Sequence, residues 1–144
     1  MHPGYDKSLV NVVLKPHARS MPRREHTALF RIQERYAATP ESRARLLDPH
    51  MVSPHEAVRL VAGLAAGSLA HADDSEPSVQ DADLLAALSL LPLLRAELDD
   101  LELGLQVMAR GEGATWAQIA AASGLGSPQA AQQRHDRLTQ RTTD

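Results

Sequence analysis

Residues 111–138 read GEGATWAQIAAASGLGSPQAAQQRHDRL, which is the signature of two short helices joined by a glycine turn. Thr115 is a suitable N-cap, and Gln118 three residues later completes a capping box for a helix over 116–122. Ser127 is the N-cap of a second helix that has Pro128 in its first position and runs to about residue 140. The segment therefore predicts a compact pair of helices near the C-terminus.

The residues around this turn meet the steric demands of a helix-turn-helix. Ala120 is small enough for close contact between the helices, and Gly124 tolerates the positive φ of the turn. Leu125 then fills the core, and Ala130 is expected to face back from the second helix, with Trp116 and Ile119 also facing inward. The alternative is an ordinary helical hairpin in an alanine-rich protein.

The exposed face predicted for the second helix favours DNA binding over such a hairpin. Gln129, Gln132 and Gln133 lie on one stripe, and four basic or imidazole side chains lie nearby. Glutamine pairs with adenine in the major groove, and arginine pairs with guanine or with a phosphate. Asp136 opposes this reading unless it is paired or accepts from cytosine. The candidate DNA-binding residues are Thr115, Ser127, Gln129, Gln132, Gln133, Arg134, His135, Arg137 and Arg141, together with Arg23 and Arg24.

Residues 93–138, LLRAELDDLELGLQVMARGEGATWAQIAAASGLGSPQAAQQRHDRL, resemble the C-terminal segment of small actinobacterial DNA-binding regulators. In that family an acidic, leucine-rich helix precedes GATWAEIA-like and QAA-like motifs. The resemblance covers a third of the chain and implies a helix-turn-helix whose second helix, starting at Ser127, enters the major groove. Pro128 stands where a basic residue is expected in many relatives.

Charge is distributed unevenly around a net value of −3. Residues 1–47 carry +5, residues 48–112 carry −9 and residues 113–144 carry +1. Because DNA binding requires local positive potential, contacts are expected only from the two ends of the chain. The basic N-terminal arm could contact phosphates or the minor groove, or form a solvated linker and helix; its cations are Lys15, Arg19, Arg23, Arg24, Arg31 and Arg35.

The remaining segments predict an all-α fold of about six helices, a helical bundle that carries a C-terminal helix-turn-helix and a short N-terminal strand-like segment. We expect a strand at 8–15, a basic linker at 16–26, helices at 23–38, 40–47 and 54–70, an acidic turn at 72–78 and helical sequence over 81–110. Ser53 caps the helix at 54–70, and Glu56 is placed to complete a capping box. Pro92 either kinks one long helix or separates two. The core is expected between 54–70 and 81–110.

Three regions follow: a strand-like segment and basic arm at 1–22, a helical accessory region at 23–78, and a leucine-rich helix plus helix-turn-helix at 79–144. Aromatic residues make up only 3 % of the chain, so the core must consist of Ala, Leu and Val. There is no cysteine, which excludes disulfides and thiolate zinc sites. The start of the chain lacks a signal-peptide pattern, and the apolar run at 84–94 is about half a membrane span.

We find no signature of an enzyme, a cofactor or a metal site. The seven histidines lack metal-site spacing and are expected at the surface. Asp73, Asp74 and Glu76 are expected in a solvated turn rather than around a cation. Asp99, Asp100 and Glu102 are expected on an exposed helix face.

The sequence therefore predicts a cytoplasmic, nucleoid-associated transcriptional regulator that binds double-stranded DNA as a homodimer, with no membrane contact. The N-terminal segment or the helix around 84–98 would supply the dimer contacts. A protein–protein adaptor with a structural C-terminal hairpin, or a nucleoid-associated binder with little sequence preference, remains the alternative. A ribbon-helix-helix in the first 47 residues is disfavoured because the gap at 16–22 is too long for that motif.

Overall fold

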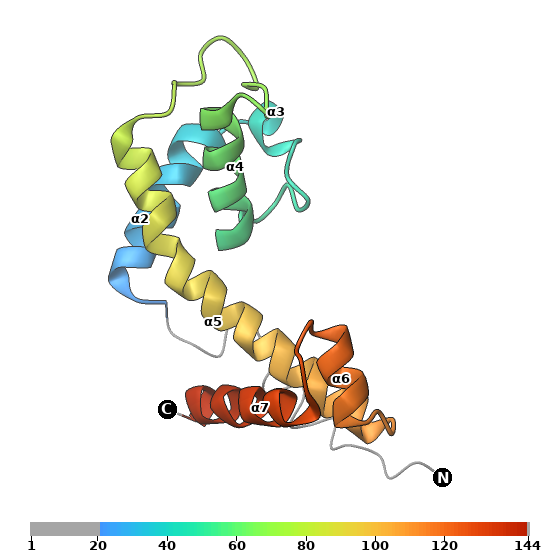
Figure 1. Cartoon of the computed structure of the whole chain (residues 1–144). Helices are drawn as coiled ribbons and strands as arrows, with labels where there is room; N and C mark the ends of the chain where they lie inside the picture. The colour runs from blue at the N-terminus through green and yellow to red at the C-terminus, as the bar shows by residue number, and fades with distance from the viewer. Residues whose placement is uncertain (1–20, 144) are drawn as a thin grey trace. The chain divides into compact units, whose positions relative to one another are not determined.

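The computed structural model describes residues 21–143, and the described chain is all-helical, as the sequence predicts (Figure 1). No strand occurs among these residues; the strand expected at 8–15 and the cations Lys15 and Arg19 lie outside them. The helices are α2 (Arg23–Tyr36), α3 (Pro40–Arg43), α4 (Pro54–Ala66), α5 (Asp81–Gly111), α6 (Trp116–Ala122) and α7 (Pro128–Thr143).

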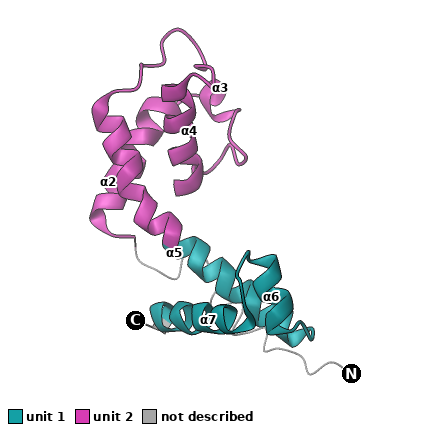
Figure 2. Ribbon diagram, in the orientation of Figure 1, with its two compact units in different colours: residues 1–19, 96–144 teal, residues 20–95 magenta. Residues whose placement is uncertain are grey.

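The chain forms two compact units, which divide within α5 between Arg95 and Ala96 (Figure 2). One unit contains α2, α3, α4 and the first half of α5. The other contains the second half of α5 with α6 and α7. The prediction placed the boundary at 78/79, just before α5. The observed boundary lies within α5, so the acidic leucine-rich helix contributes to both units.

The first unit has a core of small and branched apolar side chains from three helices. Ile32 and Tyr36 of α2, Val61 of α4 and Leu90 of α5 are all fully buried. The prediction placed this core between 54–70 and 81–110 and omitted α2. Packing of α2 supplies Tyr36, the bulkiest fully buried side chain of residues 21–143, to a core whose other members are aliphatic.

A buried carboxylate, Asp83, joins α2 to the start of α5. It is fully buried and accepts hydrogen bonds from the Tyr36 hydroxyl at 2.9 Å and from the backbone N–H of Gln80 at 2.8 Å. Arg31 and Arg35 each place Nε 2.8 Å from its Oδ1. Burial alone would raise the pKa of Asp83, but these donors and cations hold it below its ordinary value. Burial and the bond to Asp83 raise the pKa of Tyr36.

This arrangement changes the interpretation of the basic arm. Arg31 and Arg35 were candidates for phosphate contacts, but both pair with Asp83 inside the first unit. A buried carboxylate needs compensating charge, so the two guanidinium groups serve the fold.

The acidic turn at 72–78 is only partly solvated, contrary to the prediction. The Glu76 side chain is nearly buried and pairs with Arg45, while the Ala72 amide and His71 also contact its carboxylate. Burial would raise the pKa of Glu76, yet Arg45 and these hydrogen bonds hold it low. Asp73 instead accepts from the Ser75 amide and hydroxyl within the turn.

The local helix signals mostly agree with the structure. Thr39 and Ser53 cap α3 and α4, but Glu56 accepts from the Leu47 amide instead of completing the predicted capping box. α3 ends at Arg43 rather than near residue 47. α5 continues through Pro92, which settles the open choice in favour of one long helix.

None of the described helices has the length and apolar character needed to cross a membrane. Within residues 21–143, no three His, Asp or Glu side chains form a group that could hold a metal ion.

Candidate nucleic-acid interface

The turn that leads into α6 has the local structure that the sequence predicts. The Thr115 hydroxyl accepts from the Gln118 amide at 3.1 Å, and the Gln118 side chain accepts from the Thr115 amide at 2.8 Å. This capping box sets the start of α6, whose bounds Trp116–Ala122 match the prediction. Thr115 itself is exposed at the helix start.

The α6–α7 turn is a Schellman motif built on a left-handed glycine. Gly124 has φ +69°, the Leu125 amide donates to the Ala120 carbonyl at 2.8 Å, and the Gly124 amide donates to Ala121 at 3.3 Å. Leu125 packs against the cluster formed by Ile119, Ala120 and Ala131. The residue that faces back from α7 is Ala131, which is fully buried, and not Ala130 as predicted.

α7 begins where expected, because the Ser127 hydroxyl accepts from the Ala130 amide at 3.1 Å. Its outward face carries Gln129, Gln132, Gln133 and Arg137, and all four are exposed, as is Asp136 on the same face. None of these four side chains has a hydrogen-bond or ion-pair partner within residues 21–143. The predicted glutamine stripe is thus accessible and includes one free guanidinium group.

The other two arginines of α7 face the second half of α5. Arg134 forms a two-pronged pair with Glu102, in which Nη2 lies 2.6 Å from Oε2, and Arg141 lies 3.1 Å from Asp99. The hydrogen bond to Glu102 raises the pKa of Arg134. The acidic residues of α5 were expected on an exposed face; Asp99 and Glu102 are instead half-buried partners of α7.

His135 also faces α5, contrary to the expectation that the histidines lie at the surface. Its Nδ1 lies 2.8 Å from Oε1 of the buried Gln106, and its ring meets Trp116 edge-on at 5.2 Å. The Arg110 guanidinium lies 5.0 Å from the centre of the same Trp116 ring. His135 therefore anchors α7 instead of extending from its outward face.

The chain matches no protein-family model, no curated protein and no solved structure.

The predicted site residues thus separate into four groups. Thr115 and Ser127 cap helices, and Gln129, Gln132, Gln133 and Arg137 form the exposed face of α7. Arg134, His135 and Arg141 are held by α5, while Arg23 and Arg24 begin α2 in the other unit.

Sequence reasoning missed the residues of α5 that hold α7. Asp99, Glu102 and Gln106 follow helical spacing and share one face of α5. Arg134 and Arg141 are two turns apart on α7, so the complementary charge spacing was a signal that could have revealed the contact.

Proposed function

We propose that this chain is a DNA-binding transcriptional regulator that acts as a homodimer and reads the major groove with α7. The observation that carries the proposal is the exposed face of α7, where three glutamines and Arg137 lie unpaired beside a glycine turn of helix-turn-helix character. A face that only stayed in water would more commonly carry glutamate and lysine.

The side chains on the exposed face of α7 are better suited to hydrogen bonding with bases than to electrostatic attraction of the DNA backbone. A glutamine amide donates and accepts at once, which matches N6 and N7 of adenine, and Arg137 can bind guanine or a phosphate. Six carboxylates and four arginines between residues 96 and 143 give a net charge of −2. A DNA binder with little sequence preference depends on phosphate contacts, which need positive charge. The net negative charge of residues 96–143 therefore favours a sequence-specific regulator over such a binder.

The test begins with selection of preferred duplexes from a random pool by the full-length protein. Binding to a selected duplex and to a scrambled one is then measured by fluorescence anisotropy at two salt concentrations. The Gln129→Ala/Gln132→Ala variant should lose about 1–3 kcal/mol of discrimination for each base pair that it no longer reads. Arg137→Ala should weaken both duplexes alike and flatten the salt dependence if Arg137 meets a phosphate.

Gln80→Ala is a matched control, because it removes an exposed glutamine side chain that lies outside α7. It should leave binding unchanged. If the full chain binds no duplex, or if the α7 variants bind like the wild type, α7 does not read DNA and an adaptor role becomes the better account.

A further inference from the structure

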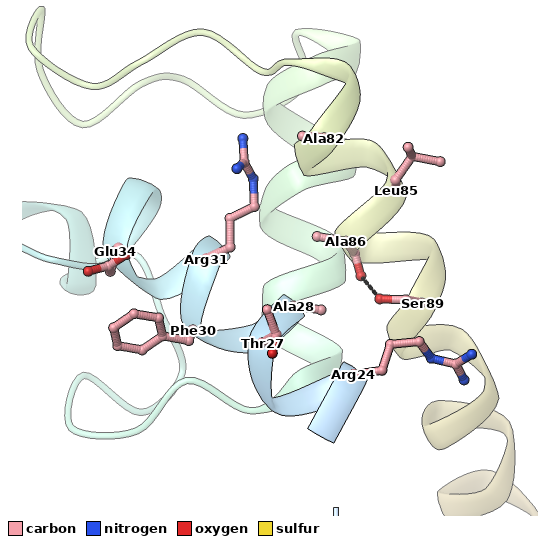
Figure 3. Close-up of a pocket in the computed structure, with 10 residues that line it drawn as sticks. All are labelled: Arg24, Thr27, Ala28, Phe30, Arg31, Glu34, Ala82, Leu85, Ala86 and Ser89. Carbon is pink, nitrogen blue, oxygen red and sulfur yellow. Dashed lines mark hydrogen bonds between the residues drawn. The ribbon is translucent and has the colours of Figure 1, made fainter. Parts of the chain in front are cut away.

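A shallow apolar groove of about 460 Å³ lies between α2 and the first half of α5 (Figure 3). Ala28, Ala82 and Ala86 form its small-residue centre. Phe30 projects from α2 on one side, and Leu85 projects from α5 on the other. The groove lies entirely within the first unit.

The two large side chains at the groove are unusually accessible for apolar residues. Phe30, the chain's one phenylalanine, is 60 % exposed, and Leu85 is 65 % exposed. Leu88, one turn further along α5, is also 57 % exposed, but it does not line the groove. Exposed apolar side chains that gather at one groove indicate an interaction site, whereas apolar residues scattered singly over a surface do not.

Opposite charges lie at the two ends of the groove along α2. Arg24 and Glu34 both line it and are ten residues apart, which is roughly 15 Å along a helix axis. Glu34 has no charged or hydrogen-bonding partner within residues 21–143. Among the residues that the structure describes, Arg24 pairs only with its neighbour Glu25, at 3.1 Å, and its side chain is 69 % exposed.

We propose that a second copy of this chain docks on the groove, with the two α2 helices antiparallel across a two-fold axis. A two-fold interface uses the same patch twice and therefore must be complementary to itself. A surface with a cation at one end and an anion at the other satisfies that requirement. The arrangement places Arg24 of each copy opposite Glu34 of the other, so two equivalent ion pairs form.

The small residues at the centre of the groove leave room for larger side chains of the second copy, as close packing between helices requires. Burial of Phe30 and Leu85 supplies the hydrophobic gain, and the end charges fix the antiparallel direction.

The inference deepens the proposed function and rests on its homodimer part, because it names the face through which the regulator would pair. The test measures mass in the absence of DNA. Failure of the dimer therefore does not coincide with failure of DNA binding by α7, which the anisotropy assay measures separately.

Sedimentation equilibrium of the full-length protein over a range of concentrations tests the interface. Glu34→Arg is the cleanest single change, because Glu34 has no internal partner to lose; it should weaken dimerisation about tenfold, since it turns two attractions into repulsions. Arg24→Glu should have a similar effect. The double variant Arg24→Glu/Glu34→Arg should restore dimerisation, because both ion pairs form again with the charges exchanged.

A pair of leucine variants locates the apolar part of the interface. Leu85→Gln should weaken the dimer about a hundredfold, because the loss occurs in both copies. Leu98→Gln is the matched control: Leu98 is 63 % exposed on the same helix but belongs to the other unit. Circular dichroism melts verify that each variant is folded.

Three results would overturn the proposal. The first is a monomer at the highest concentration reached, and the second is a dimer that Leu98→Gln breaks while Leu85→Gln leaves it intact. The third is a folded double charge-exchange variant that stays as weakly dimeric as the single variants. Because the charge and leucine variants probe the interface independently, loss of folding in one set leaves the other decisive.

Discussion

The pairing of Arg134 with Glu102 leads to a quantitative prediction about DNA binding. In the free protein the Arg134 guanidinium forms an ion pair with Glu102 of α5, so it is not available to a ligand. Glu102→Gln removes the opposing carboxylate while it preserves the length and helix propensity of the side chain. Arg134 lies next to the outward face of α7, so the variant should free it to meet a backbone phosphate.

The size of the effect follows from the exposure of the pair. The side chains of Arg134 and Glu102 are 39 % and 28 % exposed, so solvent screens them and the pair contributes about 1 kcal/mol at most. DNA affinity should therefore rise, by no more than about fivefold, when the competing carboxylate is gone. One added phosphate contact should also steepen the slope of log K against log salt by about 0.9.

Fluorescence anisotropy of a selected duplex, titrated at four or more salt concentrations, measures both quantities. Glu112→Gln is the control, because it neutralises an exposed carboxylate near α6 that has no partner in the described chain. Arg134→Gln in the Glu102→Gln background should abolish the gain. The reasoning is refuted if folded Glu102→Gln has the wild-type slope, or if Glu112→Gln steepens the slope equally, since the effect would then reflect net charge alone.

Three further predictions concern stability. Asp83→Asn should lower the free energy of unfolding by about 3–5 kcal/mol in urea titrations, because it leaves buried donors and cations without their carboxylate; a loss below about 1 kcal/mol would contradict this. Gly124→Ala should cost about 1 kcal/mol through the left-handed φ alone, since open space surrounds its Cβ, whereas Gly126→Ala, equally open and without positive φ, should be neutral. The lowered pKa values of Asp83 and Glu76 imply stability that is complete above the unfolded carboxyl pKa of about 4 and lost as pH falls through the folded values. Melting temperatures from pH 7 to pH 3 should show this fall, and it should be smaller in Asp83→Asn.

The sequence predicts the start of each helix better than it predicts the contacts between helices. Ser53, Thr115 and Ser127 all cap the helices they were expected to cap, because a cap depends on residues at most three positions away. The glycine turn at Gly124 is equally local. These signals locate the α6–α7 pair almost to the residue.

Contacts between distant residues were not predictable in the same way. Tyr36 meets Asp83 across 47 positions, and Arg134 meets Glu102 across 32. Which face of a helix is covered depends on what packs against it, and an arginine can form a two-pronged pair with a phosphate or with a carboxylate. Arg31, Arg35, Arg134 and Arg141 looked like DNA ligands for that reason, and the carboxylates that hold them became visible only in the fold.

The pairing of these cations also bears on how the proposed regulator would bind. On α7, Arg137 is the one arginine without a partner in the described chain, and residues 96–143 are net negative. A single α7 then gains little from counterion release and depends on the glutamine contacts to bases. Such a reader needs a second α7 to reach useful affinity, because two linked contacts bind far more tightly than one. An interface such as the α2–α5 groove would supply that second α7, and a folded monomeric variant should still bind the same duplex, but more weakly than the dimer does.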